Sequence, residues 1–217
     1  AYRTLAEQLA LTLPDLERSR SDWKEFKRAP LGRKGSYVVG ADIAACYQQI
    51  DHELLARELL VQTGDFETVD AIKGLLHLTS GTRQGIPQQS HSSDLIADPF
   101  LAKLERSLVR RRLQVDRYND DFLFTCATWS EVIRSIEVME EEARHLGLIV
   151  NDQKTITWRR GTYETRLDEA DDLRRQLADE AELDLTRFDT NPYDGSVVAE
   201  APAQADVDAL SALRILE

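Results

Sequence analysis

The feature that most constrains this chain is a pair of adjacent aspartates, Asp120 and Asp121, set between two apolar stretches. Residues 118–121 read Tyr-Asn-Asp-Asp, and residues 122–126 are mostly apolar and strand-forming. Unpaired carboxylates are strongly disfavoured near a core. Asn and Asp tolerate the backbone of a tight turn, so a hairpin over 115–126 would place both acids at its tip. The sequence predicts either a tip that binds a cation, for which Mg²⁺ is the usual oxygen-seeking candidate, or a solvated acidic tip.

A third carboxylate, Asp42, stands in a similar setting. Residues 37–43 read as a short apolar strand that reaches this aspartate, and helical spacing begins at Ala44. An Asp at such a junction is either a helix N-cap or a carboxylate directed out of the edge of a sheet. One Asp at a strand end and two at a hairpin tip can together hold two divalent ions, which clamp the attacking and leaving oxygens of a phosphoryl transfer.

The order of these segments resembles the palm motifs of reverse transcriptases. Four motifs of that family correspond in order and spacing to residues 42–47, 85–90, 118–121 and 146–155. Residues 51–55 and 93–97 are more similar to bacterial retron, group II intron and abortive-infection enzymes than to retroviral ones. The resemblance extends over residues 38–158.

The pattern of strand, helix, hairpin, helix and strand predicts an α+β fold. It matches the reverse transcriptase palm, a split βαβ antiparallel sheet with helices on one face. We expect reduced fingers and N-terminal helices at 1–36, the palm at 37–160 and a helical, acidic C-terminal extension at 161–217, with no obvious full thumb. Helices are expected at 5–16, 23–26, 51–62, 66–78, 92–109, 129–146 and 168–185, and further strands at 148–150 and 155–158. Ser92 or Ser93 is the candidate cap of the helix at 92–109, Ser130 is that of the helix at 129–146, and Gly147 would end the latter.

The resemblance implies a nucleotidyltransferase, an RNA-directed or template-independent DNA polymerase that adds dNTPs to a 3′-hydroxyl. In that family Asp42 and Asp120 would bind both of two Mg²⁺ ions, with Mn²⁺ as an alternative. Asp121 would support the ion on the primer side, and the carbonyl of Ile43 would complete the shell on the nucleotide side.

Ala45, Cys46 and Tyr47, which follow these metal ligands in the chain, are expected to contact the nucleotide. Tyr47 corresponds to an aromatic gate that excludes a 2′-hydroxyl, and its alternative interpretation is a core tyrosine. Ala45 and Cys46 would offer backbone amides to the triphosphate.

The remaining expected site residues come from other motifs. Gln88 corresponds to a residue that contacts the incoming nucleotide and template, although Gln89 replaces the usual glycine and could crowd a template. Lys154 corresponds to a lysine that protonates the departing pyrophosphate, and its alternative is a solvated loop lysine. Residues 1–5 are expected to be the end of a fingers strand, in which Arg3 corresponds to an arginine that grips the triphosphate.

The charge distribution bears on a nucleic-acid partner. The net charge is −12, which by itself disfavours phosphate binding. Residues 161–217 carry 15 acids and 5 bases, so residues 1–160 are close to neutral. Bases concentrate at 18–34 and along 103–117, on a helix that leads into the hairpin, where a primer–template would lie. A solvated helix face is the alternative for each cluster.

Composition favours a cytoplasmic protein with no membrane partner. The only cysteines, Cys46 and Cys126, lie in apolar segments and suit reduced thiols, and we expect neither a leader nor a membrane span. The resemblance implies RNA, including a dedicated noncoding RNA, a DNA product and dNTPs as partners, with a homo-oligomer or accessory subunit in addition. A role in bacterial antiphage (antiviral) defence is expected. The alternative function is a catalytically inactive nucleic-acid-binding scaffold in a larger assembly.

Overall fold

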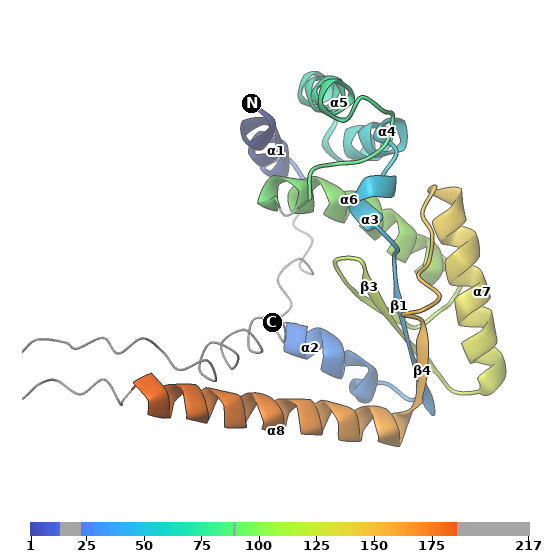
Figure 1. The fold of residues 1–217 in the computed structure, drawn as a ribbon. Coiled ribbons are helices and arrows are strands. Elements are labelled where there is room, and N and C mark those ends of the chain that lie inside the picture. Colours follow the sequence, from blue (N-terminus) through green and yellow to red (C-terminus); the bar gives the residue numbers. More distant parts are fainter. Residues whose placement is uncertain (14–22, 89, 186–217) are drawn as a thin grey trace, which may run out of the picture. The chain divides into compact units, whose positions relative to one another are not determined.

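The computed structural model describes residues 1–13, 23–88 and 90–185 (Figure 1). The chain divides into two units, one of residues Ala1–Arg160 and one that begins at Gly161. Within the first unit, the described strands form one antiparallel sheet in the order β2-β3-β1-β4. The strands are β1 (Tyr37–Asp42), β2 (Val115–Tyr118), β3 (Asp121–Cys126) and β4 (Ile156–Arg159). This is the α+β antiparallel fold that the sequence predicted.

The helices of the described residues are numbered in chain order. They are α1 (Tyr2–Ala10), α2 (Trp23–Arg28), the 3₁₀ turn η1 (Ala29–Gly32), α3 (Cys46–Gln49), α4 (His52–Thr63), α5 (Phe66–Ser80), α6 (His91–Arg110), α7 (Trp129–His145) and α8 (Arg160–Leu185). Helices α6 and α7 pack on the sheet, α1 and α4 pack with α6, and α5 packs with α1 and α4 (Figure 1).

The strand register assigns each side chain to one of two sheet faces, because cross-strand partners share a face. Val39 pairs with Phe124 and Ala41 with Phe122, and all four are buried in the main hydrophobic core. The intervening residues point to the other face, where Asp42 pairs with Asp121 at the end of both strands.

Gly40 lies on that second face, and its lack of a side chain leaves room for a side chain of the neighbouring strand. The indole of Trp158, on β4, lies so close that a Cβ at position 40 would be 2.9 Å from it. Trp158 is half-buried, and its indole packs over β1 at Gly40.

Helix ends follow local capping. The side chain of Asp51 accepts from the amides of Glu53 and Leu54, which starts α4. The Thr128 hydroxyl accepts from the Glu131 amide at the start of α7. The expected cap at Ser130 was therefore wrong, because Thr128 stands one residue before the first helical turn.

Three other expectations about elements need correction. Residues 1–5 are not a strand: Tyr2, Leu5 and Leu9 have helical spacing and pack α1 against its neighbours. Helix α6 begins at His91, ahead of the expected caps at Ser92 and Ser93. Residues 148–150 contribute a single bridge, between Ile43 and Val150, and no strand.

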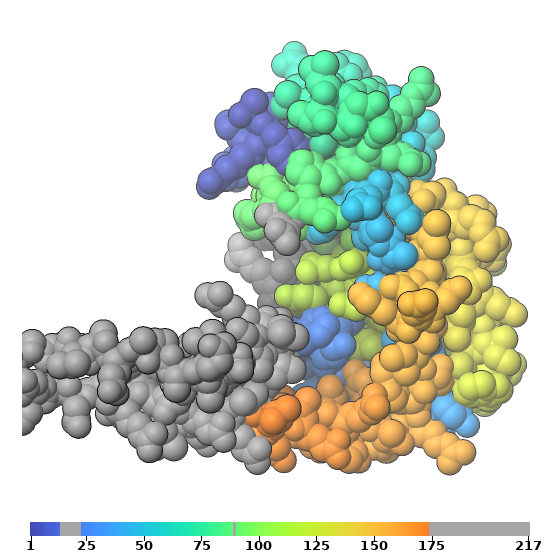
Figure 2. All heavy atoms as spheres, in the orientation of Figure 1, coloured from blue at the N-terminus to red at the C-terminus, as the bar shows by residue number. Residues whose placement is uncertain are grey.

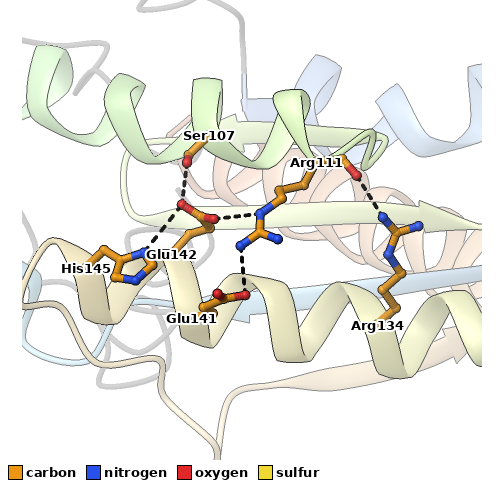
Figure 3. Close-up of polar contacts among 6 residues, drawn as sticks. All are labelled: Ser107, Arg111, Arg134, Glu141, Glu142 and His145. Carbon is orange, nitrogen blue, oxygen red and sulfur yellow. Dashed lines mark hydrogen bonds and ion pairs between the residues drawn. The ribbon is translucent and has the colours of Figure 1, made fainter.

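Helices α6 and α7 are joined by a polar network centred on Glu142 (Figure 3). Glu142 accepts from the Ser107 hydroxyl and from Arg111 Nε at 2.8 Å, and Arg111 Nη2 also pairs with Glu141 at 2.9 Å. The Ser107 hydroxyl, together with Arg111, lowers the pKa of the Glu142 carboxyl.

Much of the predicted basic cluster at 103–117 is thus engaged within the protein. Besides Arg111, both Lys103 and Arg106 pair with Glu58 of α4. These bases neutralise neighbouring acids, so the cluster offers less net positive charge to phosphates than its sequence suggested.

No helix in the described ranges 1–13, 23–88 and 90–185 combines the length and the hydropathy that crossing a bilayer requires.

Candidate functional site

The three predicted acids converge at one end of strands β1 and β3. Asp42 and Asp121 are direct cross-strand partners. The Cα atoms of such antiparallel pairs are about 4.5–5.5 Å apart. Asp120 occupies the two-residue turn between β2 and β3, and its carbonyl accepts from the Ile43 amide at 3.3 Å. Asp42 is far from the other two acids in sequence, and the pairing of β1 with the hairpin brings it to them.

The side chain of Arg117 holds the turn that carries Asp120. Asn119 takes a positive φ of 51°, as Asn can in a tight turn. Its carbonyl accepts from Arg117 Nη1 at 2.9 Å. The same buried guanidinium pairs with Asp98 at 2.6 Å and with Glu105 at 3.3 Å, both on α6. Arg117 therefore ties the acidic turn to the longest helix of the first unit.

Helix α2 covers the other side of the hairpin. Trp23 and Phe26 pack on Tyr118, with ring centroids 5.1 Å and 5.8 Å away. Lys27 lies over the Trp23 ring at 4.2 Å, and its charge opposes the rise in the pKa of Asp121. In Figure 2, atoms of the hairpin (yellow-green) are visible at the surface between those of α2 (blue) and α3 (lighter blue).

The site holds excess negative charge. Burial, with the charges of Asp120 and Asp42, raises the pKa of Asp121 to about 6. Burial and the Asp42 charge likewise raise the pKa of Asp120. The same acids contribute to the raised pKa of the Cys46 thiol, about 12, for which burial is the main cause. Carboxylates that raise each other's pKa favour the binding of a cation.

Asp42 is contacted from the segment that follows α7. Lys154 Nζ lies 3.2 Å from its Oδ2, and Asn151 Nδ2 donates to the same oxygen at 3.2 Å. The Asn151 amide also donates to the Asp42 carbonyl at 2.8 Å. The bond to Asp42 raises the pKa of Lys154, so this lysine remains a proton donor at neutral pH.

The donor set suits a hard divalent cation, since Asp42, Asp120 and Asp121 supply only oxygen ligands. Among the described residues, no three acidic, histidine or cysteine side chains already gather around one point. Like charges repel, and the Asp42 carboxylate is directed to Lys154 and Asn151. The predicted ligands, with the Ile43 carbonyl beside them, thus fit an ion by type and backbone position, and the metal site stays a prediction.

The loop at 83–86 is fastened to the segment that follows Asp42. The Ile86 amide donates to the Tyr47 carbonyl at 2.8 Å, and the Gly85 amide to the Ile50 carbonyl at 2.9 Å. His52 contacts the loop twice: its amide donates to the Arg83 carbonyl at 3.0 Å, and its Nε2 to the Gly85 carbonyl at 2.7 Å. Gly85 has a φ of 95°, which favours glycine.

The residues expected to contact the nucleotide are only partly brought together by the fold. Tyr47 is half-buried against the core, and its hydroxyl donates to Asp94 at 2.6 Å. Ala45 has a positive φ of 46° and precedes Cys46, which is buried at the start of the four-residue α3. Gln88 is exposed at the end of the 83–88 segment. Gln89, the departure from the family pattern, lies outside the described residues.

Arg3 differs most from its expected setting. It lies on α1, its side chain is 83% exposed, and its guanidinium pairs with Glu7 one turn along at 2.8 Å. The expectation of a strand there was wrong, and the role of Arg3 in binding the triphosphate stays a prediction.

Some contacts at the site had no distinct signal in the sequence. Asn151 and Asp94 lie inside recognised motifs, but nothing local shows that they face Asp42 and Tyr47. Arg117 counted as one more base in a cluster, although two acids on α6 at helical spacing, Asp98 and Glu105, could have indicated a buried partner.

An antiparallel sheet with an acid at the end of its central strand and two more on the adjoining hairpin is the palm arrangement of nucleic-acid polymerases. The family described as reverse transcriptase (RNA-dependent DNA polymerase) matches residues 3–175. The chain therefore belongs to the reverse transcriptase family.

A solved telomerase shares the fold. The apo telomerase from Candida tropicalis truncated from its C-terminal domain has a TM-score of 0.52 and 14% identity, covering 72% of this chain and 40% of that chain. Telomerase from Candida albicans, in complex with a TWJ fragment of telomeric RNA, has a TM-score of 0.48 and 12% identity, covering 73% of this chain and 33% of that chain. The chain thus spans well under half of these telomerases. No curated protein matches it.

Proposed function

We propose that the chain is a DNA polymerase that adds deoxynucleotides to a 3′-hydroxyl, directed by an RNA template or without a template. The observation that carries this proposal is the direct pairing of Asp42 with Asp121, with Asp120 in the adjoining turn. Membership of the reverse transcriptase family supports the same activity. A binding scaffold has no need to keep three carboxylates at one sheet end against their mutual repulsion.

The acids would hold two divalent ions, Mg²⁺ or Mn²⁺, as members of this family use divalent metal ions. When bound, such ions lower the pKa of the attacking hydroxyl and neutralise the leaving pyrophosphate. Asp42 would contribute to both positions, since it pairs with Asp121 across the ladder and the next residue, Ile43, bonds to the Asp120 carbonyl.

Lys154 would act on the leaving group. Its side chain is 66% exposed and reaches Asp42 at 3.2 Å, and it is protonated at neutral pH. A triphosphate bound beside Asp42 would offer its phosphate oxygens to Lys154 in place of the Asp42 carboxylate. Lys154 can then donate its proton to the pyrophosphate oxygen as the bond to the α-phosphorus breaks.

Tyr47 would select the sugar. Its ring packs on the core and projects from the short helix that follows Asp42. A tyrosine ring packed against the sugar of the incoming nucleotide would leave no room for a 2′-hydroxyl. The exposed Gln88 would contact the base or the template strand.

RNA, in the form of a template or a dedicated noncoding RNA, is the proposed partner, together with dNTPs and the DNA product. The expected homo-oligomer or accessory subunit, the cytoplasmic location and the role in bacterial antiphage defence rest on the sequence alone and stay predictions.

The test is incorporation of labelled dNTPs by purified protein with Mg²⁺, with and without RNA. We expect Asp42→Asn to abolish incorporation, while Asp70→Asn, an exposed carboxylate of α5, leaves it unchanged. Incorporation that needs no RNA would assign the template-independent variant. A wild-type protein that binds RNA and never incorporates nucleotide would refute the polymerase and support the scaffold.

A further inference from the structure

The Tyr47 side chain is fixed at both ends. Its ring packs against the hydrophobic core, and its hydroxyl donates to Asp94 Oδ1 at 2.6 Å. Hydrogen bonds from a hydroxyl to a carboxylate are short and about twice as strong as neutral ones. Burial, with the Asp94 bond and charge, raises the pKa of the Tyr47 hydroxyl, so that it stays a donor.

Asp94 is a well-anchored acceptor. It lies in the first turn of α6, a helix of 20 residues, where a carboxylate is favoured by the helix dipole. The neighbouring Ser93 is fully buried, and its hydroxyl bonds to the Tyr2 hydroxyl of α1 at 3.0 Å. The Tyr47 ring is thus tied to a helix that packs on the sheet, and not merely to its own four-residue helix.

We infer that Asp94 is a positioning residue that sets the discrimination between deoxyribonucleotides and ribonucleotides by holding the Tyr47 ring. The inference rests on the proposed function. With the hydroxyl bound to Asp94, the ring is fixed in place. Loss of Asp94 removes this restraint.

The test compares the ratio of kcat/KM for dATP and ATP in Asp94→Ala, Asp94→Asn, Tyr47→Phe and the Asp94→Ala/Tyr47→Phe double variant. We expect Asp94→Ala and Tyr47→Phe each to reduce selectivity by about 10-fold, as for loss of a hydrogen bond to a charged group. The double variant should show no further loss, because both changes break one contact. Asp94→Asn keeps an acceptor oxygen and should restore part of the selectivity.

The matched control is Glu67→Ala, which removes an exposed acid from the first turn of α5 and should leave selectivity unchanged. Unchanged selectivity in Asp94→Ala, or additive losses in the double variant, would overturn the inference while leaving the polymerase intact.

Nucleotide binding separates this inference from the proposed function. In the same variants, the Kd for dATP and for ATP is measured with Mg²⁺. If wild-type protein incorporates nothing but prefers dATP, and Asp94→Ala loses that preference, the polymerase fails and the Asp94 assignment holds. Wild-type protein that binds both nucleotides equally, or neither, overturns the Asp94 assignment.

Discussion

The two faces of the β1–β3 pair serve opposite purposes within one ladder. On one face Val39, Ala41 and Phe122 are buried in the core. On the other, the ladder ends in the pair Asp42 and Asp121, where burial and like charge disfavour ionisation of Asp121. Neighbouring residues in one strand can therefore serve stability and chemistry separately, because successive side chains point to opposite faces.

The largest difference between an effect on activity and an effect on stability is expected at Asp121. We expect Asp121→Asn to reduce dNTP incorporation by about 10³-fold, since bound metal ions contribute several kcal/mol to phosphoryl transfer. The folded protein should be as stable as wild type at neutral pH, or more stable, because burial disfavours the ionised carboxylate. Incorporation and urea unfolding are measured on the same preparation. A loss of stability with retained activity would assign Asp121 to the core.

Phe122, the next residue, should behave in the opposite way. Its side chain is 1% exposed, and Phe122→Ala should lower the free energy of unfolding by about 3–5 kcal/mol. Urea denaturation measures this loss. Phe66→Ala is the control, because that ring is 66% exposed and its loss should change stability little.

Arg117 is the one charged side chain of β2 on the core face, and its replacement tests how much a buried ion pair contributes to stability. Arg117→Met should cost about 3–5 kcal/mol, because it leaves Asp98 and Glu105 without their shared cation. The matched variant Arg111→Met breaks the partly exposed pairs with Glu141 and Glu142 (Figure 3) and should cost much less, because exposed ion pairs contribute little to stability. Equal costs in urea unfolding would contradict the contrast between buried and exposed pairs.

Gly40 tests packing on the acid-bearing face. Gly40→Ala should cost about 1–3 kcal/mol, because the new Cβ would lie 2.9 Å from the Trp158 indole. In a Trp158→Leu background the same substitution should cost less. Gly74→Ala is the control: this glycine lies within α5 with no atom near its Cβ position, and alanine there should stabilise the helix by about 0.5–1 kcal/mol.

The smallest effect is the pH dependence of stability. The folded pKa of Asp121, about 6, lies above its unfolded value, so its contribution to stability is present at low pH and is lost as pH rises toward 6. Without Mg²⁺, the urea midpoint of wild type should fall relative to that of Asp121→Asn between about pH 4 and 6. Parallel pH profiles would show that Asp121 titrates normally.

Local patterns predicted the parts of this fold that local chemistry determines. The strand that ends at Asp42, the hairpin around Asn119 and the stop of α7 before Gly147 follow from apolar patterning and turn residues. The expected strand at residues 1–5 failed because the family analogy was preferred to the helical spacing in the same residues.

The site was predicted less completely, because its contacts join distant segments. The acids could be found from their settings, but their partners could not. Lys154 and Asn151 lie more than a hundred residues from Asp42, and Asp94 lies 47 residues from Tyr47. Only the sheet register and the packing of α6 determine these pairs.

The backbone bonds between residues 47–52 and the loop at 83–86 have a mechanical consequence. The segment that carries Tyr47 begins five residues after Asp42, and the loop leads directly to Gln88. A base that fits badly against Gln88 and displaces the loop would therefore pull on the chain that aims Asp42. With the proposed roles of Gln88 and Asp42, correct geometry at the base and correct alignment of the reacting oxygens would be enforced by the same stretch of polypeptide.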